Sequence, residues 1–306
     1  MALNYNQVDA ITEKYFLPTL ANNWLDSNPI TKRAKEKFYR TVDGGERIVM
    51  PLGYASNSAS GWFDGSDLLS TTDNNTITAA ELYWKQLYGN ITISRKEELQ
   101  NSGKAQIISL VKSKMKNAEQ TMIDKMGTAL WNDGTTTDAL IGNRAWLSTS
   151  NTVGGIDQSA NSFFQAQVDS TTTTLSLAAM KSITNLATVD NMAPTVCFTT
   201  RTIHDLFYAL LQPQQRFADA KTADAGFKSL LFQGVPVIAD SHATAAHMIF
   251  LNEEYCHLFY HKDENMRKTP FQSPNNQNIK TSKIFWAGAY GINNPRLQGA
   301  LTAITG

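Results

Sequence analysis

The most constraining feature of this sequence is the stretch 45–133, where a two-stranded pattern leads into the longest helical pattern of the chain. An outgoing strand is predicted at Gly45–Tyr54, and a return strand at Ala80–Tyr88 continues after a glycine into Ile91–Ile93. The side chains on one face of the outgoing strand are Ile48, Met50, Leu52 and Tyr54. A polar span, Gly53–Asn75, joins the strands. Isolated hairpins are marginally stable in water, so we expect this one to lie on a neighbouring molecule.

The helical pattern that follows has a clear beginning and end. Ser94 and Glu97 have the spacing of a capping box, in which each side chain bonds the backbone N–H of the other residue. After a break at Gly103, apolar residues recur at helical intervals: Ile107, Val111, Met115, Ala118, Met122, Met126 and Leu130. The pattern ends at Trp131 and the stop signal Asn132–Gly134. A helix of about 30 residues would be about 45 Å long.

The N-terminal part is predicted to contain helical pieces over residues 5–40, with a break at Asn28-Pro29. The second piece, Thr31–Arg40, holds one acidic residue and five basic residues: Lys32, Arg33, Lys35, Lys37 and Arg40. Such a charge run fits a solvated helix face. It also fits a local basic patch that contacts nucleic acid or an acidic partner, and both interpretations stay open.

The rest of the chain is predicted to be a loop-rich span, 132–174, followed by compact α/β structure. Gly154-Gly155 is interpreted as a tight turn, because no GKS/T motif accompanies it. An amphipathic helix is predicted at Leu175–Val189, with Leu177, Met180, Ile183 and Leu186 on one side. A second helix is capped by Thr199-Thr200 and ends at Gln212-Pro213. Strands are predicted at Pro194–Phe198, Phe227–Phe232, Val235–Ile238, Met248–Leu251, Tyr255–Tyr260 and Lys283–Trp286.

Composition argues against several classes of function. The 27 basic and 27 acidic residues give no long-range attraction to phosphate, so any nucleic-acid contact must depend on local charge. No apolar run approaches the length of about 20 residues that a membrane span needs. The N-terminus lacks the form of a signal peptide. Cys197 and Cys256 lie in apolar strand-like runs, where buried free thiols are favoured over a disulfide. We therefore expect a soluble protein in the cytoplasm, with no membrane partner.

Residues that could carry chemistry do not form a convincing site. The run Asp240-Ser241-His242 contains the three residue types of a hydrolytic triad, but triad members must converge from separate parts of a fold. There is also no G-x-S-x-G elbow, so a turn is the favoured interpretation. His257 and His261 share a face of a strand without HExxH or cysteine partners. We expect no catalytic residue, no metal site and no cofactor.

A set of aromatic residues lies along the predicted hairpin: Trp62, Phe63, Tyr83, Trp84 and Tyr88. In a compact domain such a set would be core. On a projecting hairpin, large apolar side chains that face water form an association surface, which we favour because the long polar span makes a closed core difficult.

In their order and spacing, these features resemble tailed-phage major capsid proteins of the HK97-like fold, and the resemblance covers essentially the whole chain. The segments that carry it are Ala79–Gln86, Ile91–Ser94, Asn132–Gly134, Val153–Asp157, Gly234–Asp240, Phe250–Asn252 and Tyr255. The resemblance implies an α+β fold with an N-terminal arm (1–44) and an extended loop formed by a β-hairpin (45–93). A peripheral domain with a spine helix (94–174), an axial domain (175–275) and closing strands returning to the peripheral domain (276–306) would follow.

The resemblance also implies a function. Copies of the chain would assemble into the pentamers and hexamers of an icosahedral phage head that encloses double-stranded DNA without sequence specificity. The further partners would be a portal and, in some members, a decoration protein. A scaffolding protein would be separate or absent, because the chain reaches the predicted hairpin within about 45 residues of Met1. The location would be the virion, after assembly in the bacterial host cytoplasm. Lys85 is the only lysine on the hairpin, which gives no basis for the covalent crosslinks of some members.

The residues expected to contact other subunits fall into two groups. On the loop they are Trp62, Phe63, Asp64, Asp67 and Trp84. On the basic arm, which would contact a neighbour or DNA, they are Lys32, Arg33, Lys35, Lys37 and Arg40. Two rival functions are an encapsulin-type nanocompartment, which would hold an enzyme instead of DNA, and a soluble hydrolase that uses Ser241 and His242.

Overall fold

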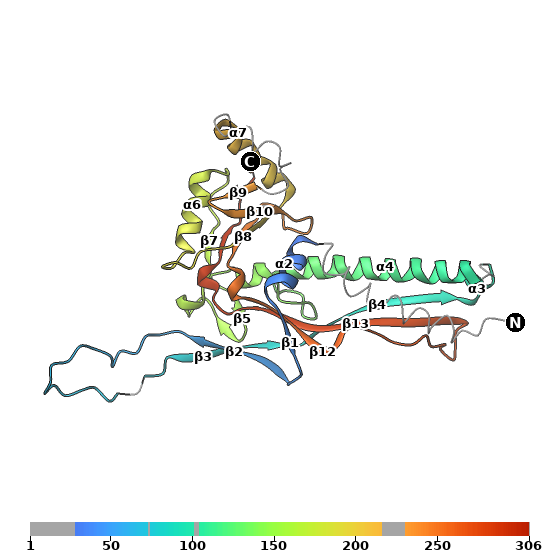
Figure 1. Cartoon of the computed structure of the whole chain (residues 1–306), viewed down its shortest axis with the longest axis horizontal. Helices are drawn as coiled ribbons and strands as arrows, with labels where there is room; N and C mark the ends of the chain where they lie inside the picture. The colour runs from blue at the N-terminus through green and yellow to red at the C-terminus, as the bar shows by residue number, and fades with distance from the viewer. Residues whose placement is uncertain (1–27, 73, 101–103, 216–229, 306) are drawn as a thin grey trace.

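The computed structural model describes residues 28–72, 74–100, 104–215 and 230–305. The molecule is elongated and has three projections (Figure 1): a hairpin on one side, a helix with two long strands on the other, and a block of helices and short strands above. Among the described residues, no helix has the length and apolar character of a membrane span.

The elements of the N-terminal half are α2 (Pro29–Lys37), β1 (Tyr39–Val42), β2 (Arg47–Gly53), β3 (Ile77–Tyr83), β4 (Lys85–Ser94), α3 (Arg95–Gln100), α4 (Lys104–Leu130), α5 (Asn143–Trp146), β5 (Thr152–Val153) and β6 (Ile156–Asp157). Those of the C-terminal half are η1 (Ser162–Phe164), β7 (Gln167–Asp169), α6 (Leu177–Leu186), β8 (Val196–Thr199), α7 (Arg201–Gln215), β9 (Leu230–Phe232), β10 (Val235–Ala239), β11 (Met248–Leu251), η2 (Glu253–Tyr255), β12 (Cys256–Lys268), β13 (Ile279–Ile292), η3 (Pro295–Leu297) and β14 (Gly299–Leu301).

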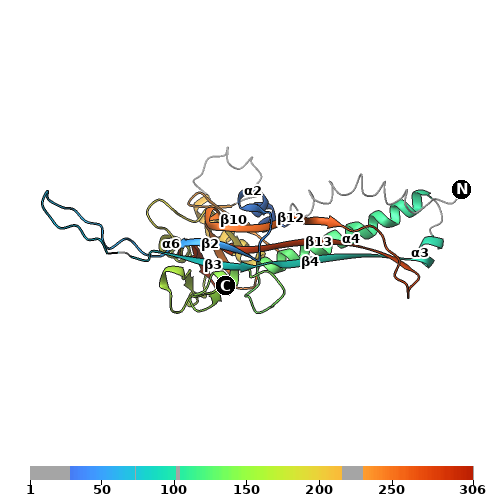
Figure 2. The ribbon, with the colours of Figure 1, turned by 90° about the horizontal axis from the view of Figure 1, so that it is seen from below.

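A four-stranded sheet has the order β1-β12-β13-β4. Its long strands β4 and β13 extend to the same side of the molecule as α4 (Figure 1), and α4 is inclined to them in Figure 2. Ile91 and Ile93 of β4 are buried, as are the helix residues predicted to face the core from Val111 onward. Helix and strand approach closely at Gly89, where an added Cβ would lie 2.7 Å from the Met122 sulfur. The predicted long helix and its apolar face are therefore confirmed over the described residues.

The predicted capping box is confirmed at the start of α3. The Ser94 backbone N–H donates to the Glu97 carboxylate at 3.0 Å, and the Glu97 N–H donates to Ser94 Oγ at 3.2 Å. The Glu97 pKa is lowered, first by the backbone hydrogen bond from Ser94 and then by the hydrogen bond from the Lys114 ammonium group. The predicted Gly-Gly turn is also present, since Gly154 and Gly155 have φ values of 58° and 78° between β5 and β6.

A six-stranded sheet, in the order β7-β14-β11-β8-β10-β9, separates two apolar cores. Successive side chains of a strand point to opposite faces. Val196 and Phe198 of β8 accordingly join the large core with α4, whereas Cys197 joins a smaller core that includes side chains of α6 and α7. Cys197 and Cys256 are both buried free thiols, as predicted.

The structure corrects the predicted return strand, which is divided at Trp84. β3 pairs with β2, whereas β4 leaves the hairpin and pairs along its whole length with β13. The buried positions are even-numbered in β3 (Ala80 and Leu82) and odd-numbered in β4 (Ile91 and Ile93). A one-residue shift exchanges the two faces of a strand, so the buried face changes at Trp84, where the chain also passes from one sheet to the other.

Other sequence expectations were wrong in extent. The segment predicted as helical up to Arg40 contains β1, which pairs in parallel with β12. β12 and β13 extend well beyond the predicted strands. Their added residues pair with each other and with β4. These residues do not form an apolar run, so the sequence pattern did not predict them. Leu186, predicted on the buried side of α6, is 58% exposed at the C-terminal end of that helix. α7 continues past Pro213 to Gln215. Ile107, residues 5–27 and Phe227 lie outside the described side chains.

Candidate interaction surfaces

The hairpin β2–β3 is held on the body of the subunit by one apolar face. Ile48, Met50 and Leu52 of β2 are buried with Leu82 of β3. They pack where β13 has Gly291, because a Cβ at that position would lie 2.7 Å from Leu82 Cδ1 and 2.8 Å from Met50 Cε. The opposite face of the hairpin is exposed. This packing at Gly291 therefore fixes the direction in which the hairpin projects.

The tip loop, residues 54–76, is ordered by its own hydrogen bonds over its described part, 54–72 and 74–76. The Asn74 side-chain amide donates to Asn57 Oδ1 at 3.1 Å and joins the two sides of the loop. At the end, the Asp64 N–H donates to the Asp67 carboxylate at 2.9 Å, and the Asp67 N–H donates to the Asp64 carbonyl at 2.8 Å. The two acids that sequence analysis assigned to subunit contacts thus also build this turn, while both remain exposed.

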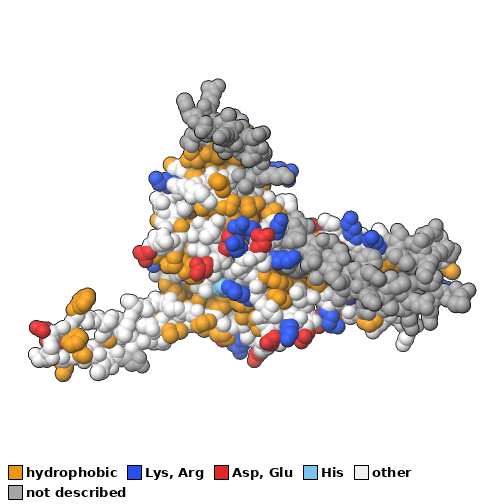
Figure 3. Space-filling model, viewed as in Figure 1, with side chains coloured by type: hydrophobic (Ala, Val, Ile, Leu, Met, Phe, Trp, Pro, Cys, Tyr) orange, Lys and Arg blue, Asp and Glu red, His pale blue; other side chains and the backbone are white. Residues whose placement is uncertain are grey.

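Large apolar side chains lie on both sides of that turn and face water. Trp62 is 105% exposed and Leu68 is 102% exposed, and Phe63 and Leu69 are each more than half exposed. Figure 3 shows apolar and acidic side chains gathered at the free end of the hairpin. No described part of the same chain covers these four side chains, which favours an association surface.

Trp84 occupies a different place from the other loop residues. It is half-buried at the base of the hairpin, where its indole N–H donates to the Gly45 carbonyl at 2.7 Å. Its ring also packs in a T-shaped arrangement with the His261 ring, with 5.5 Å between ring centroids. These contacts anchor the junction between β3 and β4.

The basic segment is divided between half-buried and exposed positions. The Arg33 guanidinium donates two hydrogen bonds of 2.8 Å to the carboxylate of Glu253, a residue far away in sequence, and so joins α2 to η2. Lys32 and Lys37 on α2, and Arg40 on β1, are exposed, whereas Lys35 is half-buried. The sequence could not reveal the Arg33 ion pair, because Glu253 lies in a separate element.

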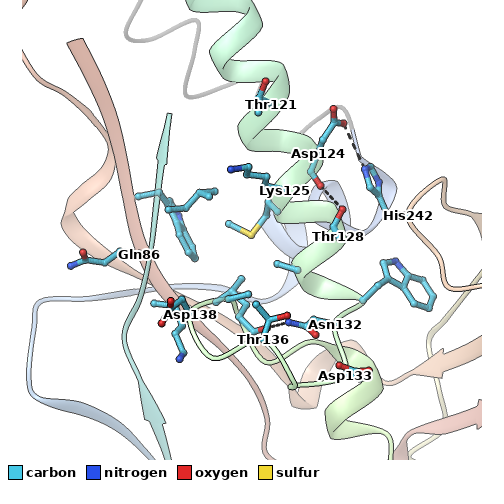
Figure 4. A pocket seen from close by; sticks show the side chains of 18 of the residues that line it. Gln86, Thr121, Asp124, Lys125, Thr128, Asn132, Asp133, Thr136, Asp138 and His242 are labelled. Carbon is cyan, nitrogen blue, oxygen red and sulfur yellow. Dashed lines mark hydrogen bonds and ion pairs between the residues drawn. The ribbon is translucent and has the colours of Figure 1, made fainter. Parts of the chain in front are cut away.

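A groove that sequence analysis missed lies between the C-terminal turns of α4 and the start of β4 (Figure 4). We call it the α4–β4 groove. Its volume is about 780 Å³. Its walls include Thr121, Lys125 and Thr128 on the helix side (Figure 4), and its apolar lining includes Met126 and Leu140. The residues come from four separate segments of the chain, so no local motif announced them.

The Asp240-Ser241-His242 run forms the predicted turn, with the His242 N–H donating to Asp240 Oδ1 at 2.8 Å. Asn28 Oδ1 caps α2 by accepting from the Ile30 N–H, so its amide nitrogen faces His242 Nδ1 at 2.8 Å. His242 Nε2 lies 3.6 Å from Asp124 of α4 (Figure 4). Because Nδ1 accepts from the Asn28 amide, it is a poor base for Ser241 Oγ, 3.3 Å away. The cluster joins α2, α4 and the turn after β10.

His257 and His261 do not gather metal ligands. Within the described residues, no group of three or more His, Cys, Asp or Glu side chains could hold a metal ion. Burial is the first cause that lowers the pKa of His257, followed by the charge of Arg40. Burial likewise raises the pKa of the Cys256 thiol to about 12, which keeps the thiol protonated.

Comparison with known proteins relates this architecture to protein shells. No protein-family model matches the sequence, and no curated protein matches it either. The capsid asymmetric unit of cyanophage A-1(L) is similar to the structure with a TM-score of 0.70 and 14% identity, covering 90% of this chain and 93% of that chain. The capsid of a native GTA particle gives a TM-score of 0.63 at 11% identity, covering 89% and 90%.

A further similar structure is the holo-SrpI encapsulin complex from Synechococcus elongatus PCC 7942, with a TM-score of 0.57 and 9% identity over 90% of this chain and 89% of that chain. At such low identities the likeness concerns the fold. The chain has the α+β fold found in phage capsid and encapsulin shell proteins, and the HK97-like fold expected from the sequence is confirmed.

Proposed function

We propose that this chain is the major capsid protein of a tailed phage, a structural protein without catalytic activity. Its copies assemble into pentamers and hexamers of an icosahedral head that encloses double-stranded DNA. The observation that carries the proposal is the projecting hairpin, whose exposed apolar tip has no cover within the described chain. The shell-protein fold over nine-tenths of the chain supports it.

The proposed parts of the subunit follow the resemblance. Residues 1–44 are the N-terminal arm, 45–93 the extended loop, 94–174 the peripheral domain with α4 as its spine, 175–275 the axial domain and 276–306 the closing strands. The block that contains α6 and α7 lies towards the capsomer centre, and the hairpin lies on a neighbouring copy. Many weak contacts of this kind become cooperative when symmetry closes the assembly.

The exposed basic residues Lys32, Lys37 and Arg40 contact DNA or a neighbouring subunit in this proposal. The chain as a whole carries no net charge, so such contacts act locally. Arg33 contributes instead to holding α2 in place through Glu253. A portal, a separate scaffolding protein and, in some heads, a decoration protein complete the proposed set of partners, and the virion is the proposed location after assembly in the host cytoplasm.

An encapsulin-type nanocompartment is the second candidate, because the similar structures include an encapsulin complex. The two functions differ in content: a phage head takes up DNA, and the nanocompartment takes up a protein cargo. Electron microscopy of the expressed chain, followed by analysis of co-purified nucleic acid and protein, separates them. A monodisperse monomer under all assembly conditions would contradict both.

A deletion tests the role of the hairpin directly. Removing 57–75 takes away the tip but leaves the buried residues of β2 and β3, so the subunit should fold and fail to close shells. A second variant replaces Trp62, Phe63, Leu68 and Leu69 by serine and keeps the loop length. It removes only the apolar side chains, and it should also fail to close shells. Normal shells from the deletion would refute the role of the hairpin.

A further inference from the structure

The sequence contains three Asp-Gly pairs, at Asp43-Gly44, Asp64-Gly65 and Asp133-Gly134, and it contains no Asn-Gly pair. Such a pair is open to rearrangement, because glycine has no Cβ to shield its backbone nitrogen. This nitrogen can attack the carboxyl carbon of the preceding aspartate and close a succinimide ring. The sequence treats the three pairs alike, and their surroundings in the folded chain distinguish them.

Asp64-Gly65 already has its reacting groups in contact. The Gly65 N–H donates to Asp64 Oδ1 at 2.9 Å, so the nitrogen lies beside the carboxyl group, and loss of its proton leaves a lone pair directed at that group. Two hydrogen bonds of the turn hold this peptide in place: the Asp64 N–H donates to the Asp67 carboxylate, and the Asp67 N–H donates to the Asp64 carbonyl. Reacting groups that are held together in this way need less reorganisation to reach the transition state.

Water has free access to this peptide. Residues 61–70 are all exposed, and the loop that contains them projects away from the body of the subunit (Figure 1). A Cβ built on Gly65 would meet no atom within 4 Å. Exposed loop tips of this kind are where changes to the chain concentrate. The solvent can therefore supply both the protons and the water that the rearrangement uses.

The other two Asp-Gly pairs lack this arrangement. Asp133 Oδ1 accepts from the Thr135 N–H at 3.1 Å and from the Thr135 hydroxyl at 2.7 Å. These bonds lower the pKa of Asp133, the hydroxyl bond first and the N–H bond second. An ionised carboxylate that is held by other donors reacts poorly with a nucleophile. In the described chain, no hydrogen bond joins the Asp43 carboxylate to the Gly44 N–H.

We propose that Asp64-Gly65 is a modification site, at which the aspartate isomerises spontaneously to isoaspartate and opens the turn of the tip loop. The Gly65 nitrogen forms a bond to Asp64 Cγ, and one carboxyl oxygen leaves as water with the amide proton and a proton from the solvent. A second water then attacks the main-chain carbonyl carbon of the succinimide and breaks its bond to nitrogen, which regains a proton. The backbone now continues through Asp64 Cβ and Cγ, and the former carbonyl carbon carries a carboxylate. Attack at the other ring carbonyl restores the aspartate.

The isomerised turn loses the hydrogen bonding that shapes the tip. Isoaspartate inserts a carbon atom into the backbone between Asp64 and Gly65 and removes the carbonyl that accepts from the Asp67 N–H. The exposed apolar side chains on the two sides of the turn then lose their fixed spacing. These side chains are Trp62, Phe63, Leu68 and Leu69. Under the proposed shell function, on which this consequence rests, chains that age before assembly make weaker contacts than fresh ones.

Enzymatic labelling tests the site on the full, unassembled chain. The purified chain is incubated at neutral pH, and an isoaspartyl methyltransferase with labelled S-adenosylmethionine then marks each isoaspartate. Digestion and mass spectrometry locate the label and detect the succinimide as a peptide that is lighter by one water. Asp64 should gain label several-fold faster than Asp43 and Asp133, which serve as internal controls.

The matched variant is Gly65→Ala. The φ of Gly65 is not positive, and its Cβ position is open, so alanine fits the native turn and only shields the nitrogen. Label at Asp64 should accumulate several-fold more slowly in this variant. Asp64→Asn keeps both backbone hydrogen bonds of the turn and offers ammonia as the leaving group, so isoaspartate should form faster at this position.

The outcomes separate this inference from the proposed function. Absence of label at Asp64, equal or faster labelling at Asp43 or Asp133, or an unchanged rate in Gly65→Ala would overturn the site, whether or not the chain forms shells. Assembly is scored separately by electron microscopy, and the aged parent chain should close fewer shells than the aged Gly65→Ala variant. Equal yields from a labelled parent chain would overturn the effect on the turn. If the fresh chain forms no shells, the proposed function fails while the labelling result stands.

Discussion

Replacing Leu82 by alanine should loosen the hairpin while leaving the body of the subunit folded. Leu82 is 2% exposed in β3 and packs directly on the backbone of Gly291 in β13. Leu→Ala changes at buried sites cost about 2–5 kcal/mol, because they remove apolar contacts and leave a cavity. The hairpin has few other buried side chains, so this loss falls mainly on its attachment. Strands β8 and β11 of the six-stranded sheet keep their pairing with each other, and their other face packs in the smaller core, which contains none of the described hairpin side chains.

Hydrogen exchange at one backbone amide measures how much the Leu82 substitution weakens the attachment of the hairpin. The Glu81 N–H donates to the Gly154 carbonyl at 2.9 Å, which links the hairpin to the β5–β6 turn of the body. A loss of about 3 kcal/mol raises the population of the detached hairpin about 150-fold. Hydrogen exchange at the Glu81 amide should accelerate by that factor, while amides of β8 and β11 keep their protection.

The control for this experiment is Val49→Ala, on the exposed face of the same hairpin. Val49 is 57% exposed, and surface substitutions of this type usually change stability by less than about 0.5 kcal/mol. Unchanged exchange at Glu81 in the Leu82 variant would refute the reasoning. Equal acceleration in β8 and β11 would show that the hairpin and the body unfold as one unit, which would also contradict it.

Three further predictions concern the body of the subunit. Glu253→Gln should cost about 1.5–3 kcal/mol, as for hydrogen bonds to charged groups, and a double-mutant cycle with Arg33→Gln in chemical denaturation should show coupling; additive effects would contradict the ion pair. Ser94→Ala should lower the free energy of unfolding by about 1 kcal/mol through loss of the cap, whereas Ser94→Thr keeps the acceptor and should be nearly neutral. The Cys256 thiol, whose pKa is raised to about 12 by burial, should resist a thiol reagent in the native protein. The thiol of the unfolded chain ionises at a lower pH than the buried thiol of the folded chain. The contribution of Cys256 to stability is therefore complete below the ordinary thiol pKa of about 8.5, and it declines as pH rises towards the pKa of the folded state. Urea unfolding of Cys256→Ala should therefore show a smaller loss of stability between neutral and alkaline pH, and an unchanged pH profile would refute the assignment.

The sequence by itself determined the elements whose signal is local. The apolar spacing from Val111 to Leu130 predicted the buried face of α4, because helical neighbours three and four residues apart share one side of the cylinder. Alternation in β2 predicted the shared face of Ile48, Met50 and Leu52, which are buried, whereas Tyr54, predicted on the same face, lies beyond β2 and is 38% exposed. The Ser94–Glu97 spacing predicted a cap whose two hydrogen bonds are present. The order of these elements also carried the resemblance that predicted the fold.

Only the tertiary structure decided where those elements pair and what they enclose. A period of two shows which side of a strand is buried and says nothing of its partner, so the transfer of the return strand to β13 at Trp84 required the folded chain. The Arg33–Glu253 ion pair and the α4–β4 groove combine residues from distant segments, which no local pattern brings together. The hairpin tip combines both kinds of information. Its sequence shows apolar side chains beside acids. Only the structure shows that those acids close a turn and that no described part of the chain covers the apolar side chains. The physical reason is that burial and pairing are properties of surfaces that exist only after distant parts of the chain have met.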